Sequence, residues 1–292
     1  ACVTTGRTHI VSTTGGYHGK TFGALSVTGR DKYRKPFEAF ISPATFVPFG
    51  DARAAAAAID TSTAAMIVEP IQGEGGIQVP PDGYLTELRR ACDRAGAMLI
   101  VDEVQTGLGR TGKLFACEYE GVHPDLMTLA KCLGGGVMPI GAVMGTAKVW
   151  EAVFSENPLL HTSTFGGGGL ACAAGLAALQ VIEEEGLVER SAKMGEILLT
   201  ELRKACTGHG DLVAEVRGRG LMVGLEFKMD EVGELVVAQL LKRNVVIAYT
   251  LNNPRVLRFE PPLIIGEKEI ATVAKAVGEA LAETSELLAT LV

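Results

Sequence analysis

The stretch that decides the fold is an apolar run that ends on a lysine. Residues 125–131 read Asp-Leu-Met-Thr-Leu-Ala-Lys, and the glycines Gly134, Gly135 and Gly136 follow almost at once. A continuous apolar run of this length suits a strand that is buried on both faces. A lysine at the end of such a strand is costly to desolvate unless it has a chemical role. Lys131 is therefore the first candidate functional residue.

Two upstream runs share this pattern. The run 64–68 ends on Glu69, and the run 97–101 ends on Asp102. Such runs predict a mostly parallel sheet covered by helices, which binds ligands beyond the carboxyl ends of its strands. Asp102 and Lys131 lie about one strand, crossover and return strand apart, so both are predicted to open onto one crevice. A purely structural Asp–Lys pair at a sheet edge is the alternative.

The composition excludes several classes of protein. The chain has 292 residues, 47% of them hydrophobic, and a formal net charge of −7, so we expect a globular protein without a nucleic-acid partner. No apolar stretch reaches the roughly 18 residues that span a bilayer, and no membrane partner is expected. The six cysteines lack paired spacing, which favours a reducing, cytoplasmic location. Because the chain begins at Ala1 without methionine, we expect its N-terminal part to be absent.

The order of the predicted elements indicates an α/β fold with two domains. In the first part, strands alternate with helices, which predicts a large domain over residues 1–186; the strands are 9–12, 64–68, 97–101, 126–130 and 140–144, and the helices are 84–95 and 170–185. After Gly186 the pattern changes to a smaller α+β domain over residues 187–292; its helices are 187–205, 232–242 and 267–291, and its strands are 212–216, 221–227, 245–248 and 256–259.

A glycine-rich segment imitates two nucleotide-binding motifs. Residues 107–113 satisfy G-x-G-x-x-G and most of a P-loop. A P-loop needs Ser or Thr after its lysine, where this chain has Leu114. A dinucleotide fingerprint starts at the end of the strand, whereas residues 102–106 intervene here. We interpret both matches as chance, and a glycine-rich loop packed beside a site is favoured.

Two segments could hold a planar, phosphorylated ligand. Residues 161–169 combine hydroxyl groups with four glycines ahead of an alanine-rich helix, which is a place that can bind phosphate. A flexible loop is an equally weighted alternative. Tyr17 and His18 follow a predicted strand, where the aromatic face could meet a planar ring or pack within a turn.

Arg258 lies between apolar neighbours, which indicates a partly buried guanidinium group. Such a group needs a carboxylate partner. Glu74, in a glycine-rich segment, is one candidate, and a substrate carboxylate is the other. The histidines lack metal-ligand spacing, so no metal site is predicted.

These groups together predict a cofactor. A lysine can form an imine with an aldehyde, an aspartate can pair with a ring nitrogen, an aromatic side chain can cover a ring face, and hydroxyl groups can bind a phosphate. Pyridoxal phosphate meets each requirement.

Along its whole length the sequence resembles the class III, fold-type I pyridoxal-phosphate aminotransferases. The resemblance is carried by the stretches 68–76, 101–113, 129–141, 161–167, 250–253 and 258–263. It implies that Lys131 binds the cofactor covalently, that Asp102 pairs with the pyridinium nitrogen and that Gln105 approaches the phenolic oxygen. It also implies that Tyr17 stacks on the cofactor ring and that His18 belongs to the same cofactor-binding site.

The resemblance carries further implications for assembly and substrate. Thr164 is implied to reach the phosphate of the cofactor in a neighbouring subunit, which predicts a homodimer. Glu74 is implied to pair with Arg258 until a dicarboxylate displaces it, so one site could accept a small-molecule amine and a 2-oxo acid. The expected activity converts putrescine or a related diamine or ω-amino acid to an aldehyde, with 2-oxoglutarate as acceptor. Ornithine, acetylornithine and 4-aminobutyrate are alternative substrates, and a catalytically silent fragment or assembly module is the alternative of another class.

Two departures from the family pattern stand out. Relatives continue the Phe-Gly-Gly loop with Asn-Pro, whereas this chain has Gly168 and Gly169, which removes a good N-cap from the following helix. Relatives also carry a phosphate-binding Gly-Thr or Gly-Ser loop ahead of the point where Ala1 stands. The chain alone is therefore expected to bind the cofactor poorly.

Overall fold

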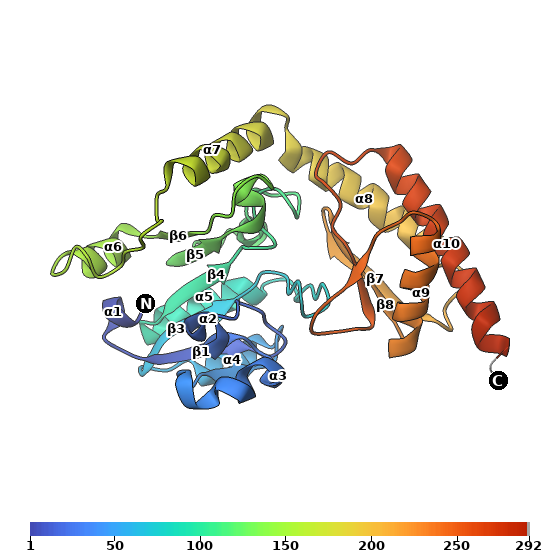
Figure 1. Ribbon diagram of the computed structural model, residues 1–292. Coiled ribbons are helices and arrows are strands. Elements are labelled where there is room, and N and C mark those ends of the chain that lie inside the picture. Colours follow the sequence, from blue (N-terminus) through green and yellow to red (C-terminus); the bar gives the residue numbers. More distant parts are fainter. Residues whose placement is uncertain (291–292) are drawn as a thin grey trace. The chain divides into compact units, whose positions relative to one another are not determined.

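The computed structural model describes residues 1–290 of the chain, which divide into two compact units (Figure 1). The first unit comprises residues 1–71, 80–108 and 115–185. The second comprises residues 72–79 and 109–114 together with the part of the chain from Gly186 onward. The domain limits of 1–186 and 187–292 stay a prediction, and residues 291 and 292 lie outside the described part.

A six-stranded sheet organises the first unit. Its strand order is β2-β1-β3-β4-β5-β6, and all neighbouring strands are parallel except β5 and β6. β3 is buried along its whole length, as expected for an apolar run covered on both faces. The predicted α/β class with a mostly parallel sheet is confirmed. The strands are β1 (His9–Thr13), β2 (Thr45–Val47), β3 (Thr63–Val68), β4 (Met98–Asp102), β5 (Leu126–Leu129) and β6 (Ala142–Gly145).

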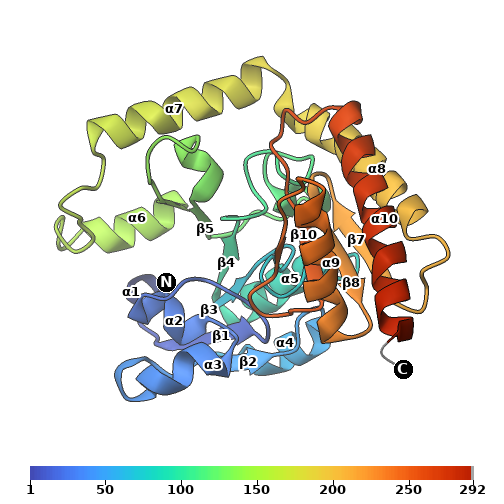
Figure 2. The same ribbon diagram turned by 45° about the vertical axis from the view of Figure 1, so that its right-hand side comes forward.

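Helices connect the strands of this unit. In α5, Leu85, Leu88 and Cys92 are buried on one face, and Gly96 ends the helix in a left-handed conformation with φ 63°. α6 and α7 lie on the β5–β6 side of the sheet (Figures 1 and 2). The helices are α1 (Cys2–Thr5), α2 (Phe22–Val27), α3 (Asp31–Arg34), η1 (Lys35–Phe40), α4 (Ala52–Ala58), α5 (Tyr84–Ala95), η2 (Ala116–Glu120), η3 (Lys131–Gly134), α6 (Ala147–Phe154) and α7 (Gly169–Glu184).

The second unit has a four-stranded sheet in the order β7-β8-β10-β9, and its pairs are antiparallel. α10 packs against both α8 and α9. On α8, Gly195 permits a close approach, since a Cβ atom there would lie 2.2 Å from the carbonyl oxygen of Gly220. The elements are α8 (Leu187–Ala205), β7 (Val213–Arg219), β8 (Met222–Phe227), α9 (Asp230–Lys242), β9 (Ala248–Tyr249), β10 (Val256–Phe259) and α10 (Glu267–Thr290).

Some elements differ from the sequence-based expectation. The short elements β2, α1, α2, α3 and α6 were not predicted, because segments of three to eight residues carry little periodic signal. The strand predicted at 245–248 is wrong in extent, because only Ala248 and Tyr249 pair with β10. The last residue of the helix predicted at 267–291 lies outside the described residues.

Neither a membrane span nor a metal site is found in the described part of the chain. No helix within residues 1–290 combines the length and the apolar character needed to cross a bilayer. The same residues contain no group of three or more His, Cys, Asp or Glu side chains placed to hold a metal ion.

Candidate active site

The carboxyl ends of β4 and β5 lie side by side in the first unit. The two strands are parallel, and Asp102 stands opposite Thr128 in their register. β4 ends at Asp102, and Lys131 follows the end of β5 by two residues. The ends of these two neighbouring strands therefore carry the aspartate and lead to the lysine. Both residues are thus at the edge where ligands bind in open parallel sheets.

Lys131 differs from the expectation of a buried lysine. Its side chain is exposed in the single chain, because the glycine-rich turn after β5 leaves it at the surface rather than beneath the turn. Its backbone has φ 46°, a left-handed conformation that is uncommon for residues other than glycine. Residues in such conformations occur often at functional sites, and no pattern in the sequence predicted this feature.

Asp102 forms a buried ion pair with His18. His18 Nδ1 lies 2.7 Å from Asp102 Oδ2, and their side chains are only 2% and 7% exposed. Burial alone would raise the pKa of Asp102, but the hydrogen bond and charge of His18 and the N–H of Val104 hold it below its ordinary value. Burial would lower the pKa of His18, but Asp102 and the charge of Glu69 raise it. Asp102 is therefore held as a carboxylate at the end of β4.

The turn that carries Tyr17 and His18 is held by Glu69, a role that the sequence did not reveal. The backbone N–H of Tyr17 donates to Glu69 Oε2 at 2.9 Å, and the backbone N–H of His18 donates to Thr28 Oγ1 at 3.1 Å. Glu69 is buried at the end of β3. The ring of Tyr17 meets the ring of Tyr33 edge-on, with 6.3 Å between centroids.

Gln105 lies in the segment after β4, next to a buried carboxyl group. Glu103, which is 1% exposed, accepts hydrogen bonds from the hydroxyl of Thr106 and from the backbone N–H of Cys117. Burial raises the pKa of Glu103. These bonds tie the segment that carries Gln105 to η2, a contact that no pattern in the sequence predicted.

The structure places Thr164 in an exposed segment before α7. α7 begins at Gly169, and its N-cap residue Gly168 makes no side-chain hydrogen bond. This agrees with the absence of a capping side chain noted from the sequence. Thr164 has no described contact with Lys131 or Asp102.

The glycine-rich segment 109–114 packs within the second unit. A Cβ atom at Gly112 would lie 2.9 Å from Ala192 of α8. Arg110 Nη1 donates to the carbonyl oxygens of Leu221 and Pro261, at 3.0 and 2.6 Å. These contacts give the segment a packing role within the second unit, and its predicted place beside a site stays a prediction.

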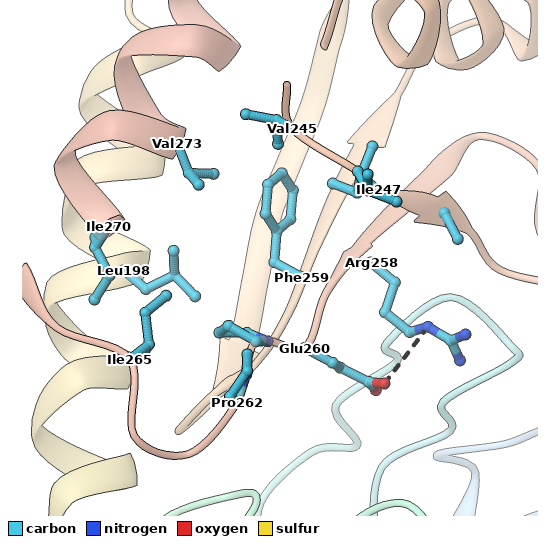
Figure 3. Close-up of a pocket in the computed structure, with 13 residues that line it drawn as sticks. Leu198, Val245, Ile247, Arg258, Phe259, Glu260, Pro262, Ile265, Ile270 and Val273 are labelled. Carbon is cyan, nitrogen blue, oxygen red and sulfur yellow. Dashed lines mark ion pairs between the residues drawn. The ribbon is translucent and has the colours of Figure 1, made fainter. Parts of the chain in front are cut away.

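Glu74 and Arg258 form an ion pair in the second unit. Arg258 Nη1 lies 2.6 Å from Glu74 Oε1, with the side chains 20% and 7% exposed. Glu74 Oε2 also accepts the backbone N–H of Leu251 at 2.9 Å. Arg258 Nε lies 3.6 Å from Glu260 Oε2, as the dashed line in Figure 3 marks. The guanidinium group of Arg258 is thus already paired, and a ligand carboxylate could bind it only by displacing Glu74.

A pocket of about 480 Å³ lies beside β10 and is lined mostly by apolar side chains, together with Arg258 and Glu260. In Figure 3, the side chains of Phe259, Val245 and Val273 face this space, while the guanidinium of Arg258 points away from them. Alternate residues of a strand point to opposite faces. Arg258 contributes to the lining of the pocket, but its guanidinium group is directed to Glu74, whereas the ring of Phe259 faces the pocket.

The family model and the similar solved structures all describe aminotransferases or transaminases. Residues 2–281 match the family model described as aminotransferase class-III. An ornithine aminotransferase structure from Toxoplasma gondii is 36% identical with a TM-score of 0.90, and the match covers 96% of this chain and 65% of that one. An aminotransferase from Bacillus anthracis is 31% identical with a TM-score of 0.89, covering 97% of this chain and 71% of that one. A transaminase from the marine bacterium Virgibacillus is 30% identical with a TM-score of 0.89, covering 96% and 69%.

The chain spans about two thirds of the length of these structures and 65% of the ornithine aminotransferase. Pyridoxal phosphate is the cofactor that the family match implies. With a family model that covers nearly all of its residues, the chain belongs to the class-III aminotransferases.

Proposed function

We propose that the protein catalyses the transamination of a terminal amine, with a 2-oxo acid as acceptor. Putrescine or a related diamine or ω-amino acid is the proposed donor, and 2-oxoglutarate, which becomes glutamate, is the proposed acceptor. The observation that carries the proposal is the buried Asp102–His18 pair at the end of β4, beside the strand that leads to Lys131. This chemistry requires a carboxylate that stays charged for the ring nitrogen and a lysine for the aldehyde of the cofactor.

The residues at this edge fit pyridoxal phosphate by their chemistry. The lowered pKa of Asp102 keeps an anion available for a protonated ring nitrogen. The exposed amine of Lys131 is accessible to an aldehyde. Tyr17, on the turn fixed by Glu69, supplies an aromatic face. Lys131, Asp102, Tyr17 and Gln105 are thus the residues that we propose hold the cofactor.

We assign the chemical roles as follows. When bound, pyridoxal phosphate supplies an electron sink that stabilises negative charge on the substrate carbon. Lys131 Nζ would take the proton from that carbon as general base and would return it, as general acid, to the carbon that carries the aldehyde of the cofactor. Asp102 keeps a proton on the ring nitrogen, and His18 keeps Asp102 charged and oriented.

Substrate alternation rests on the Glu74–Arg258 pair in this proposal. With a diamine, Glu74 neutralises Arg258 through their 2.6 Å contact. With a 2-oxo diacid, a substrate carboxylate takes the place of Glu74 on the guanidinium, which binds carboxylates in a bidentate manner. One protein could then accept a cation and a dianion in turn.

A homodimer is part of the proposal. The segment around Thr164 and helix α7 exposes large apolar side chains, namely Leu159 (76%), Phe165 (89%), Leu170 (78%) and Leu176 (60%). Exposed apolar groups gathered in one region of a chain commonly mark a protein–protein interface. We propose that a second copy covers this region and that Thr164 contributes to the cofactor site of the partner.

Ornithine is the second candidate donor, supported by the similarity to ornithine aminotransferases. Acetylornithine and 4-aminobutyrate remain further alternatives. These amines differ mainly in one end group. A panel of half-reactions, which follows the loss of the cofactor's visible absorbance with each amine, ranks them directly.

Borohydride reduction tests the proposed function. The protein is incubated with pyridoxal phosphate, reduced, digested and analysed by mass spectrometry. We expect a phosphopyridoxyl group on Lys131, its loss in Lys131→Arg and its retention in the control Lys113→Arg. An adduct at other lysines alone, or no adduct at saturating cofactor, would contradict the proposal and favour a catalytically silent module.

A further inference from the structure

The turn that presents Glu74 has a strained backbone. Ile77 is fully buried and has φ 48°, and the preceding Gly76 has φ 110°. A positive φ is rare for a β-branched residue, because Cβ then crowds the carbonyl oxygen. Such a conformation persists only where the surrounding contacts enforce it. Some group outside the turn must therefore hold it.

Arg217 of β7 is that group. It is only 8% exposed, and its guanidinium bonds the strained Ile77 and the glycine before it: Nε donates to the carbonyl oxygen of Ile77 at 3.0 Å, and Nη2 donates to that of Gly76 at 2.5 Å. The remaining nitrogen, Nη1, contacts Glu226 at 2.5 Å and Glu215 at 2.8 Å. The two carboxylates compensate the buried charge, so the fork is fixed in one orientation.

The same turn is linked to the loop that follows β9. The carbonyl oxygen of Glu74 accepts the backbone N–H of Asn252 at 2.9 Å, and its carboxylate accepts that of Leu251 at 2.9 Å. A Cβ atom at Gly76 would lie 3.1 Å from the side chain of Asn253. Glu74 is therefore placed against Arg258 by backbone contacts that depend on the shape of the turn.

We propose that Arg217 is a positioning residue that sets the specificity of the Glu74–Arg258 pair. By holding the strained turn, Arg217 keeps Glu74 on Arg258, and so favours a substrate end that is cationic over one that is a carboxylate. The effect on specificity rests on the proposed function for its substrates. The mechanical claim, that Arg217 holds the turn, rests only on the described contacts of the turn.

Lysine cannot replace this arginine. The guanidinium group of Arg217 uses three nitrogens in one rigid plane to bond two carbonyl oxygens and two carboxylates. The ammonium group of a lysine is a point charge on a flexible stem and cannot reproduce this arrangement. Arg217→Lys keeps the charge and releases the turn. Arg203→Lys is the matched control, because Arg203 also donates to a β7 carbonyl oxygen, that of Val216 at 3.2 Å, and has no described contact with the turn.

Hydrogen exchange of the full chain tests the mechanical claim. In Arg217→Lys, we expect the amides of Leu251 and Asn252 to exchange about tenfold faster than in the wild type. Arg203→Lys should leave these amides unchanged. If Arg217→Lys does not fold, the same measurement is made on the double variant Arg217→Gln, Glu226→Gln, which removes both charges together. Unchanged exchange in the folded variant overturns the proposal.

Kinetics test the effect on specificity. We expect Arg217→Lys to raise the ratio of the KM for the diamine to the KM for 2-oxoglutarate about tenfold, since a loosened Glu74 no longer masks Arg258 from a cation. Glu74→Gln should shift the ratio in the same direction. Because Arg217 acts through Glu74, the double variant should shift it no further than Glu74→Gln alone.

Each outcome has one interpretation. An additive effect in the double variant, or an unchanged ratio in Arg217→Lys, overturns the specificity role. If the wild-type protein turns over no amine at all, the proposed function fails, and the exchange of Leu251 and Asn252 still decides whether Arg217 holds the turn.

Discussion

Breaking the Asp102–His18 pair should reveal a large coupling energy. The 2.7 Å pair is almost wholly buried, and at an effective dielectric constant of about 20 its gross attraction is about 6 kcal/mol. Desolvation cancels much of this attraction. Removing one partner, in Asp102→Asn or His18→Gln, leaves the other buried without its counter-charge, which costs about 3 to 5 kcal/mol.

A double-mutant cycle measures the coupling directly. We expect the double variant to lose about 2 to 3 kcal/mol less than the sum of the two single losses. Urea unfolding followed by tryptophan fluorescence is a suitable assay, because the chain has one tryptophan, Trp150, and it lies in the first unit with the pair.

The coupling should depend on pH in a defined direction. The pKa of His18 is raised above its ordinary 6.5, so its stabilising contribution is complete below pH 6.5 and is lost as the pH rises through the raised pKa. The pKa of Asp102 is lowered below its ordinary 3.8, so its contribution is complete above that pH and is lost in stronger acid. Between pH 3.8 and 6.5 both contribute in full, and the cycle belongs there.

The pair Arg90–Glu87 on α5 is the matched control. Its atoms are also 2.6 Å apart, but the side chains are 63% and 48% exposed. Solvent screening should limit its coupling to about 1 kcal/mol or less. If the Asp102 and His18 losses add to within about 0.5 kcal/mol, or if the control couples more strongly, the account of a buried, functionally charged Asp102 is refuted.

Two further predictions concern glycines and cysteines. A Cβ atom at Gly195 would lie 2.2 Å from a backbone oxygen, so Gly195→Ala should destabilise the protein by about 2 to 3 kcal/mol. At Gly278 of α10 the nearest atom to such a Cβ is 3.6 Å away, so Gly278→Ala should stabilise the protein by about 0.5 to 1 kcal/mol. Thermal unfolding of the two variants measures both effects. Burial raises the pKa of Cys92 and of Cys117 to about 12, so iodoacetamide at pH ~8 should label exposed Cys2 and spare these two until urea unfolds the chain. Rapid labelling of Cys92 would show that its side of α5 is open.

Local sequence determined the sheet and the placement of its key residues. The apolar runs at 64–68, 97–101 and 126–130 predicted β3, β4 and β5, because strands covered on both faces need continuous apolar residues. Since these strands are parallel, the residues that end them, including Asp102, necessarily meet at one edge of the sheet.

Tertiary structure alone decided the contacts that tune these residues. His18 and Asp102 are 84 positions apart, and Arg217 and Gly76 are 141 apart; no periodic pattern links such pairs, because their meeting depends on strand register and on how loops close. The same holds for the exposure of Lys131 and for the membership of segments 72–79 and 109–114 in the second unit. Apolar periodicity is a local property that the sequence encodes directly, whereas a buried charge finds its partner only once the whole chain has packed.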